Sequence, residues 1–375
     1  MLVNKSLSWV CDMPQYIVGK STDQLAEEYK FKKEDIIKLA SNENPYGCSE
    51  IVKDFFRKGL TSIHRYPDPD CSDLKKKLSS LNGIYPDQIF VGNGSNEVLD
   101  YIAKGFISSG RSAVFSEYCF AVYPIIVQAA GGESLVASSD KLCGHSLENF
   151  LKKIKSTTSL IFIANPNNPT GGFLSNSEIE LFLKEVDPNT VVVLDEAYHE
   201  YCLGQKNTVE LLKTFKNLLI TRSFSKAFGL AGLRVGYAIG SRSLIEYLNR
   251  LRQPFNVNLI AQQAACLALE DLSFVTKSVE KNEICKKFLE EKFKKLKIFS
   301  LPSKGNFLLV KVNNFGSSEN NKYISGNDVY KRLLRFGIIT RPVENYGLND
   351  WLRVSIGNMA ESKRFLTAVT ETYFK

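Results

Sequence analysis

Short apolar runs alternate with helix-length segments between about residues 86 and 240 of the chain. Six of these runs are predicted to be strands, because they are rich in Val, Ile, Leu and Phe and are bounded by turn-forming residues. They cover residues 88–92, 112–116, 159–165, 190–196, 218–223 and 235–240. Apolar runs without polar alternation are typical of strands buried on both faces. The pattern therefore predicts an α/β fold in which helices, expected for example at 95–106 and 175–186, cover a mostly parallel sheet.

The pattern changes after about residue 241, where helical periodicity extends over longer segments. Two long helices are expected at about 241–252 and 258–298. A smaller set follows, with strands at 306–312 and 351–357, a helix at 328–337 and a final helix to Lys375. A chain of 375 residues exceeds the size at which a single core usually stops growing. We therefore expect three parts, namely an N-terminal arm at 1–45, a large domain at 46–275 and a small α+β domain at 276–375.

Composition and charge argue against several classes of protein. The chain is 44% hydrophobic and 23% charged, as globular proteins are. Its 48 basic and 40 acidic residues give a net charge of +8, but the excess is scattered, which favours a solvated surface over a nucleic-acid site. Asp12 and Pro14 interrupt the apolar residues near the start, so no signal peptide is expected. The uncharged run at 118–132 is too short to span a bilayer, so no membrane association is expected.

The cysteines and histidines do not form a pattern typical of metal sites. Eight cysteines are dispersed without a C-x-x-C pair, which favours reduced thiols in the cytoplasm over a disulfide framework or a zinc site. The three histidines, His64, His145 and His199, lie far apart in the chain, and His199-Glu200 lacks a second histidine four residues on. We therefore expect a cytoplasmic protein with no metal.

Polar residues follow several of the predicted strands, and in an open α/β sheet such strand ends face the ligand. The segment "GNGSNE" (92–97) opens a helix at Ser95 and Asn96, so its free backbone N–H groups can bind phosphate, although tight turns also contain Gly-x-Gly. The segment "NPNNPTGG" (165–172) is a polar double turn. Asp195 ends the run "TVVVLD", where either a helix cap or a cationic partner would explain a carboxylate.

Two cations complete this set. Lys226 lies in "SFSKAFGLAGLR" (223–234), among small and apolar residues that lower the pKa of a lysine and make its amine nucleophilic. Arg353 interrupts the apolar run "WLRVSIG" (351–357) and requires an anionic partner, because arginine does not lose its charge. A lysine for a Schiff base, an aspartate for a pyridinium nitrogen, phosphate donors and an arginine for a carboxylate are together the parts of a pyridoxal phosphate site.

Two other functions were weighed against this one. The segment "SFSK" also fits the Ser-x-x-Lys motif of serine acyl-transferring enzymes, but the chain lacks their Ser-Asp-Asn and Lys-Thr-Gly elements. A non-catalytic binding protein on the same scaffold is the second alternative, since a fold does not determine a function. The lysine, aspartate and arginine argue against it.

Several segments resemble those of histidinol-phosphate aminotransferases, which are fold-type I, class II pyridoxal-phosphate aminotransferases. They are "LASNENPYG" (39–47), "RYPD" (65–68), "NPNNPTG", "LDEAY", "SFSKAFGLAGLR" and "ITRPVENYGLNDWLRVSIG" (339–357). The resemblance runs from about residue 10 to the end. It implies a large α/β/α domain that binds pyridoxal 5′-phosphate, a smaller α+β domain, an arm that packs with the small domain or the partner subunit, and a homodimer.

The resemblance also implies roles for individual residues. Lys226 would carry the cofactor as a Schiff base and move the reacting proton, Asp195 would pair with the ring nitrogen, and Tyr118 would stack on the ring. Asn168 and Tyr198 would bind the ring hydroxyl oxygen. The phosphate of the cofactor would be bound by Ser95, Asn96, Ser223, Ser225 and Arg234, and by Tyr66 of the neighbouring subunit. The implied substrate contacts are Arg353 for the carboxylate, Arg341 and Tyr16 for the substrate phosphate, and Asn44 and Tyr66 beside them.

The implied reaction is the reversible conversion of imidazole-acetol phosphate and L-glutamate into L-histidinol phosphate and 2-oxoglutarate, in histidine biosynthesis. An aromatic amino-acid aminotransferase and a threonine-phosphate decarboxylase would use the same central residues. The sequence alone determines neither the preference between histidinol phosphate and aromatic amino acids, nor regulation, nor an assembly larger than a dimer.

Overall fold

A seven-stranded sheet forms the centre of the large part of the molecule in the computed structural model, which describes residues 6–13, 19–59, 62–312 and 324–373. The strand order is β2-β8-β7-β6-β5-β3-β4. Strands β4, β3, β5, β6 and β7 run parallel, whereas β8 is antiparallel to both β7 and β2. The strands are β2 (Ile89–Gly92), β3 (Ser112–Ser116), β4 (Glu133–Ala137), β5 (Thr158–Ala164), β6 (Val191–Asp195), β7 (Leu218–Ser223) and β8 (Gly236–Ile239).

All six strands that the sequence predicts here are present, and the expectation of a mostly parallel sheet is confirmed. Strand β4 is not among the predicted strands; it is an edge strand in which only Leu135 and Ala137 are buried. Glu133 and Ser134 break its apolar run, so it lacks the signal by which the other strands are recognised.

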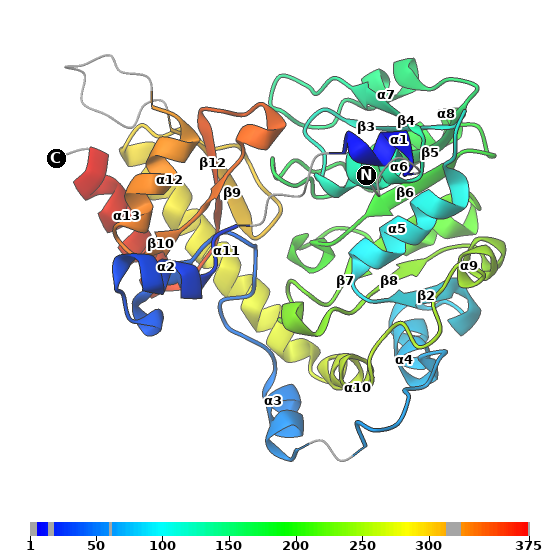
Figure 1. Ribbon diagram of the computed structural model, residues 1–375, viewed down its shortest axis with the longest axis horizontal. Helices are drawn as coiled ribbons and strands as arrows, with labels where there is room; N and C mark the ends of the chain where they lie inside the picture. Colours follow the sequence, from blue (N-terminus) through cyan, green and yellow to red (C-terminus); the bar gives the residue numbers. More distant parts are fainter. Residues whose placement is uncertain (1–5, 14–18, 60–61, 313–323, 374–375) are drawn as a thin grey trace.

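Helices cover both faces of this sheet (Figure 1). Successive strand residues enter different cores, because side chains alternate across a strand. In β5, Ile161 and Ile163 pack in one core, whereas Leu160 and Phe162 pack in the other. The first core includes α4 (Ser72–Asn82), α7 (Leu147–Lys153), α8 (Asn176–Glu185) and α10 (Leu259–Ala268), and the second includes α5 (Ser95–Phe106), α6 (Val122–Ala129) and α9 (Arg242–Asn249).

A smaller three-stranded antiparallel sheet, in the order β11-β12-β9, forms the second part of the molecule. It packs with the C-terminal helices in a core of its own, which Figure 1 shows beside the large part. The elements are β9 (Phe307–Lys311), β11 (Arg341–Pro342), β12 (Trp351–Ser355), α11 (Leu272–Lys295), α12 (Gly326–Leu334) and α13 (Met359–Tyr373).

Part of the N-terminal segment packs with this second part. Strand β1 (Ile37–Lys38) pairs in parallel with β10 (Ile338–Ile339). Helix α2 (Thr22–Tyr29) packs through Leu25 against Ala40, Leu334 and Ile339. Earlier in the chain, α1 (Ser8–Cys11) contacts α6. Helix α3 (Glu50–Arg57) lies at the edge of the molecule (Figure 1), where it contacts α10 and buries Val52 in the first core of the large part. The short 3-10 helices in the described residues are Lys33–Asp35, Pro86–Gln88, His199–Tyr201, Thr208–Lys213, Ala231–Leu233 and Glu344–Tyr346.

One expected helix is divided. The single helix expected at about 258–298 is wrong, because α10 ends at Ala268 and α11 begins at Leu272. The Asp271 side chain accepts a hydrogen bond from the Phe274 backbone N–H, which caps α11 and ends the continuous pattern. Helix α11 contributes Val279 to the core of the large part and Phe293 to the core of the small part. The boundary predicted at 275–276 falls inside this helix, and the three-part division stays a prediction.

No helix in the described part of the chain is both long enough and apolar enough to cross a membrane. Within the same residues, no group of three or more His, Cys, Asp or Glu side chains could hold a metal ion.

Candidate active site

A cavity of about 420 Å³ lies where three parallel strands end. The last residues of β5, β6 and β7, which are Ala164, Asp195 and Ser223, line its floor. The small part of the molecule and the N-terminal segment close the other side through Arg353, Arg341 and residues 38 and 40–43. Of the residues that the sequence singles out, the cavity is lined by Ser95, Asn96, Asn168, Asp195, Tyr198, Ser223, Ser225, Lys226, Arg234, Arg341 and Arg353.

Lys226 presents a reactive amine to this cavity. Its Nζ donates a hydrogen bond to the Ser41 carbonyl oxygen at 3.0 Å and lies 5.7 Å from the centre of the Tyr198 ring. Burial, and then the positive charge of Arg353, lower the pKa of Lys226 from 10.5 to about 8. A substantial fraction of the amine is therefore neutral near pH 8, and only the neutral amine can attack a carbonyl group.

Asp195 sits at the end of β6 as a buried carboxylate held by hydroxyl groups. It accepts hydrogen bonds from the Tyr123 hydroxyl at 2.9 Å and from Thr221 Oγ1 at 3.0 Å. Burial raises the pKa of Asp195, while these two donors act in the opposite direction. A cation placed in the cavity beside Asp195 would favour the ionised form and would receive its hydrogen bond.

Asn168, Tyr198 and Arg353 form a polar wall that spans both parts of the molecule. Arg353 Nη1 donates to Asn168 Oδ1 at 2.6 Å, and Arg353 also bonds the Ala40 carbonyl oxygen. Tyr198 accepts a hydrogen bond from Asn42 Nδ2 at 2.9 Å, and burial raises the pKa of Tyr198 to about 12. Tyr198 therefore stays a neutral hydroxyl that can still donate a hydrogen bond into the cavity.

An anion cradle is built around the N-terminus of α5. Gly94 precedes this helix with a φ of 81°, and a Cβ there would lie 2.6 Å from Arg234 Nη2. A Cβ on Gly236 would lie 2.4 Å from the Ser95 backbone nitrogen. Both positions therefore require glycine, which lets the guanidinium of Arg234 approach the helix N-terminus closely. Arg234 Nη1 also donates to Ser225 Oγ at 3.3 Å. Guanidinium, hydroxyl and free backbone N–H groups at one point are the donors that a phosphate group prefers.

Positive charge dominates the rest of the cavity. Arg341 of β11 lies opposite Arg353 of β12 in the register of the small sheet. Lys20 and Lys38 line the same cavity, and Lys38 forms a 3.0 Å ion pair with Glu43. Among the described lining residues, the cations Lys20, Lys38, Lys226, Arg234, Arg341 and Arg353 face only two carboxylates, Glu43 and Asp195. The cavity therefore suits ligands that carry more than one negative charge.

The donor set fits pyridoxal phosphate. The anion cradle could bind its phosphate, and Asp195 could bind its ring nitrogen. Asn168 and Tyr198 could bind its ring hydroxyl group, and Lys226 could react with its aldehyde.

Three described residues implied by the resemblance, Tyr118, Asn44 and Tyr66, are not among those that line the cavity. Tyr118 packs instead on the cluster of Leu301, Leu309, Val343, Leu348 and Trp351, and Phe120, two residues on, lines the cavity. Asn44 donates to the Ala227 carbonyl oxygen at 2.8 Å, so it braces the loop that carries Lys226. Tyr66 is 81% exposed and stacks on Phe255, while Tyr16 lies outside the described residues.

The sequence analysis missed other residues of the site. Asn42 lies inside the quoted segment "LASNENPYG", and its amide could have been singled out there. Thr221 lies two residues before Ser223, on the same side of β7, so the period of a strand could have found it. Tyr123 lies in the apolar helix α6 and Phe120 in the loop before it, and neither segment carries a local signal of a polar site.

The family model, two relatives and a solved structure that match this chain are all those of aminotransferases. The family model for aminotransferases of class I and II matches residues 34–369. Histidinol-phosphate aminotransferase 2 of Pseudomonas fluorescens is 43% identical, over 96% of this chain and 95% of the relative. The protein of the same name from Pseudomonas aeruginosa is 44% identical, over 94% of each chain. Among solved structures, histidinol-phosphate aminotransferase from Sinorhizobium meliloti in complex with pyridoxal-5′-phosphate has a TM-score of 0.88 at 24% identity, covering 99% of this chain and 98% of that chain.

Proposed function

The chain belongs to the class I and II aminotransferases, and from this premise we propose that it is a histidinol-phosphate aminotransferase with pyridoxal 5′-phosphate as its cofactor. It transfers the amino group of L-glutamate to imidazole-acetol phosphate and forms L-histidinol phosphate and 2-oxoglutarate, reversibly. The observation that carries this proposal is that Lys226 and Asp195 line one cavity together with the anion cradle at α5.

When bound, pyridoxal phosphate supplies an aldehyde that accepts the amino group and a ring that delocalises the charge left on the substrate carbon. With the cofactor bound, Lys226 Nζ would hold its aldehyde carbon and, when released, would carry the proton at the substrate α-carbon. A pKa of about 8 suits this task, because a proton carrier is most effective when its pKa lies near the working pH. Asp195 would hold the proton of the ring nitrogen in place.

We propose that Arg353 and Arg341 bind the negatively charged groups of the two substrates, one substrate after the other. Arg353 binds the carboxylate of glutamate, since its planar fork matches the two oxygens of that group. Arg341, its cross-strand neighbour, binds the phosphate of the other substrate. The same pair of cations therefore accepts a dicarboxylate in one half of the reaction and a phosphate ester in the other. Asn168 and Tyr198 orient the ring of the cofactor through its hydroxyl oxygen.

One experiment tests the proposed reaction and the role of Arg341. We expect kcat/KM with 2-oxoglutarate as acceptor to be higher for histidinol phosphate than for phenylalanine or tyrosine. Arg341→Ala should lower kcat/KM for histidinol phosphate by about 100-fold, because a charged contact to phosphate is lost. The glutamate half-reaction, followed by absorbance of the bound cofactor, should fall less than tenfold.

The control is Arg250→Ala, since Arg250 is exposed and pairs only with Glu246 in the described contacts. Equal losses for histidinol phosphate and glutamate in Arg341→Ala would contradict a phosphate contact at this residue. A wild-type preference for tyrosine or phenylalanine would contradict the proposed substrate.

We further propose that the enzyme is a homodimer in which Tyr66 completes the cofactor site of the partner subunit. Tyr66 is 81% exposed and stacks on the exposed Phe255, and the exposed Ile63 lies three residues earlier in the chain. Contiguous exposed apolar residues of this kind mark protein interfaces. The eight cysteines, all free thiols, support a cytoplasmic location for this assembly.

Subunit complementation tests the shared site. Lys226→Ala and Tyr66→Ala proteins should each be weakly active alone. After mixing in equal amounts and subunit exchange, half of the dimers should be mixed, and each mixed dimer should hold one intact site. About a quarter of the wild-type activity should then return. Activity equal to the mean of the two separate proteins, or a sedimenting mass of a single 42.1 kDa chain, would contradict the proposal.

A further inference from the structure

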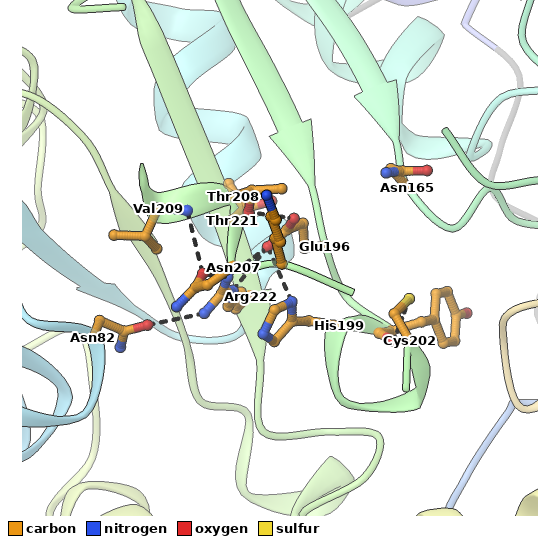
Figure 2. A network of polar contacts seen from close by, with 12 residues as sticks. Asn82, Asn165, Glu196, His199, Cys202, Asn207, Thr208, Val209, Thr221 and Arg222 are labelled. Atoms are coloured by element: carbon orange, nitrogen blue, oxygen red, sulfur yellow. Dashed lines mark hydrogen bonds and ion pairs between the residues drawn. The ribbon is translucent and has the colours of Figure 1, made fainter. Parts of the chain in front are cut away.

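A buried polar network lies next to the cavity, around Glu196 and Arg222. Glu196 follows Asp195 directly in the chain, and Arg222 directly precedes Ser223. Both side chains are almost completely buried, with exposed fractions of 4% and 3%. Figure 2 shows Arg222 enclosed by Glu196, Asn82 and Asn207. The cavity lining includes neither Glu196 nor Arg222.

Arg222 is bonded through all three of its guanidinium nitrogens. Its Nε and Nη2 lie 2.9 and 2.8 Å from Glu196 Oε2. Its Nη1 donates to Asn82 Oδ1 at 2.9 Å, and its Nη2 donates to Asn207 Oδ1 at 2.8 Å. The other carboxylate oxygen of Glu196 accepts a hydrogen bond from Thr208 Oγ1 at 2.6 Å. In this arrangement each guanidinium nitrogen and each carboxylate oxygen of the pair has a polar partner.

The network connects separate elements at the ends of the two strands that carry the site. Asn82 is the last residue of α4, and Asn207 and Thr208 begin the 3-10 helix Thr208–Lys213. The backbone N–H of Glu196 donates to the Thr221 carbonyl oxygen at 2.8 Å, one step beyond the paired residues of β6 and β7. The ion pair thus fixes β6 and β7 relative to each other just where the strands end.

The residues of the candidate site lie on the other face of these strand ends, opposite the ion pair. Side chains alternate across a strand, so Asp195 and Thr221 point away from the Glu196–Arg222 pair. Thr221 Oγ1 donates to Asp195 Oδ1 at 3.0 Å, and this contact requires the register that the pair fixes. A small shift between β6 and β7 would separate Thr221 from Asp195 and would displace Ser223.

Stability alone is a weak reason for such a pair. Removing two charges from water costs about as much free energy as their attraction returns, and apolar residues of similar volume are often as stable. The presence of a buried ion pair here is explained better by the relative position of β6 and β7 that it specifies.

We propose that the Glu196–Arg222 pair is a positioning device that holds Asp195 and Ser223 in register for the cofactor. This inference rests on the proposed function, because it takes Asp195 and Ser223 as cofactor contacts. Neither member of the pair touches the reacting atoms, so both are positioning residues.

A double variant separates positioning from stability. In Glu196→Leu/Arg222→Met, two apolar side chains of similar volume replace the pair, so that neither of its charges stays buried without the other. We expect this protein to unfold at nearly the wild-type temperature. Its dissociation constant for pyridoxal phosphate should nevertheless rise about tenfold or more, as when supporting contacts of a bound group are lost. The visible circular dichroism of the bound cofactor, which reports the orientation of its ring, should weaken, and kcat should fall more than KM changes.

A matched control replaces a different ion pair, one that has a member on α4. Lys77 and Glu270 form a 2.7 Å pair between α4 and the end of α10 that is not part of the network. Lys77→Met/Glu270→Leu should retain the wild-type cofactor affinity and dichroism. A Glu196→Leu/Arg222→Met protein with wild-type affinity and dichroism would overturn the proposal.

If the double variant does not fold, Asn82→Ala decides the question. This change removes one of the acceptors of Arg222 and leaves the ion pair in place. It should lower cofactor affinity about threefold in a stable protein, and unchanged affinity and dichroism would overturn the proposal. Failure of the proposed function is distinguishable, because then the wild-type protein itself would not bind pyridoxal phosphate.

Discussion

Lys226→Ala should abolish transamination and leave the fold intact. The methyl group of alanine can neither bind the cofactor covalently nor move a proton at the substrate carbon. We expect kcat/KM for glutamate to fall by more than about 10⁴-fold, because the nucleophile and the proton carrier are lost together. The loss should be measured from single-turnover absorbance changes, with thermal unfolding of the same samples as the test of folding.

Covalent capture of pyridoxal phosphate gives a second measurement. Borohydride reduction should add the mass of the cofactor to wild-type protein and should not add it to Lys226→Ala. Because the pKa of Lys226 is lowered to about 8, the capture rate of the wild-type apoprotein should rise with pH through about 8 rather than 10.5. A rise only near pH 10.5 would show that the amine is not perturbed.

The lowered pKa also determines the sign of the effect on stability. The folded protein binds a proton at Lys226 less tightly than the unfolded chain, so charging this lysine opposes folding. That cost is fully present below about pH 8 and disappears as the pH rises from about 8 to 10.5. The apoprotein of Lys226→Ala should therefore be at least as stable as wild type at pH 7, and the difference should shrink towards pH 10.5.

Lys184→Ala is the control, because Lys184 is a surface lysine that pairs with Glu180 one helical turn away. It should have wild-type turnover and wild-type capture. Normal turnover in Lys226→Ala would refute the assignment of the site.

The sequence predicts the central sheet well, because its strands are continuous apolar runs. The same reasoning fails where burial is one-sided, as in β4, whose exposed residues include Glu133. It fails again between α10 and α11, since one capping residue, Asp271, ends a pattern that otherwise continues. Periodicity reports which residues are buried, whereas a cap acts through a single hydrogen bond.

Some residues of the candidate site can likewise be predicted from the sequence, and others cannot. Lys226, Asp195 and Arg353 are conspicuous in sequence, because each is a charge inside an apolar or small-residue segment. Asn42 and Tyr123 come from distant segments and are brought to Tyr198 and Asp195 only by the fold. Tyr118 was selected by resemblance, yet Phe120 lines the cavity, and the direction of a side chain in a loop is not encoded in a motif. The Glu196–Arg222 pair is likewise invisible until β6 and β7 are adjacent.

Asp195→Asn should retain covalent attachment of the cofactor but lose most of the turnover. Asparagine has nearly the same size and can still accept a hydrogen bond from Tyr123 or Thr221, so the fold should survive. It carries no negative charge, however, and cannot hold a proton on the ring nitrogen of the cofactor. Removing a fixed charge that stabilises the transition state in a water-poor site typically costs about 10²–10³-fold in rate. We expect a loss of that size in kcat for glutamate.

The two variants should therefore fail at different steps. Borohydride should still trap the cofactor in Asp195→Asn, because Lys226 Nζ is intact, whereas trapping is lost in Lys226→Ala. Asp73→Asn is the control, since Asp73 is an exposed carboxylate in the first turn of α4 and pairs with Lys76. If Asp195→Asn turned over glutamate at the wild-type rate, the charge at the end of β6 would have no part in the reaction. If it failed to trap the cofactor at all, Asp195 would be needed for binding rather than for turnover.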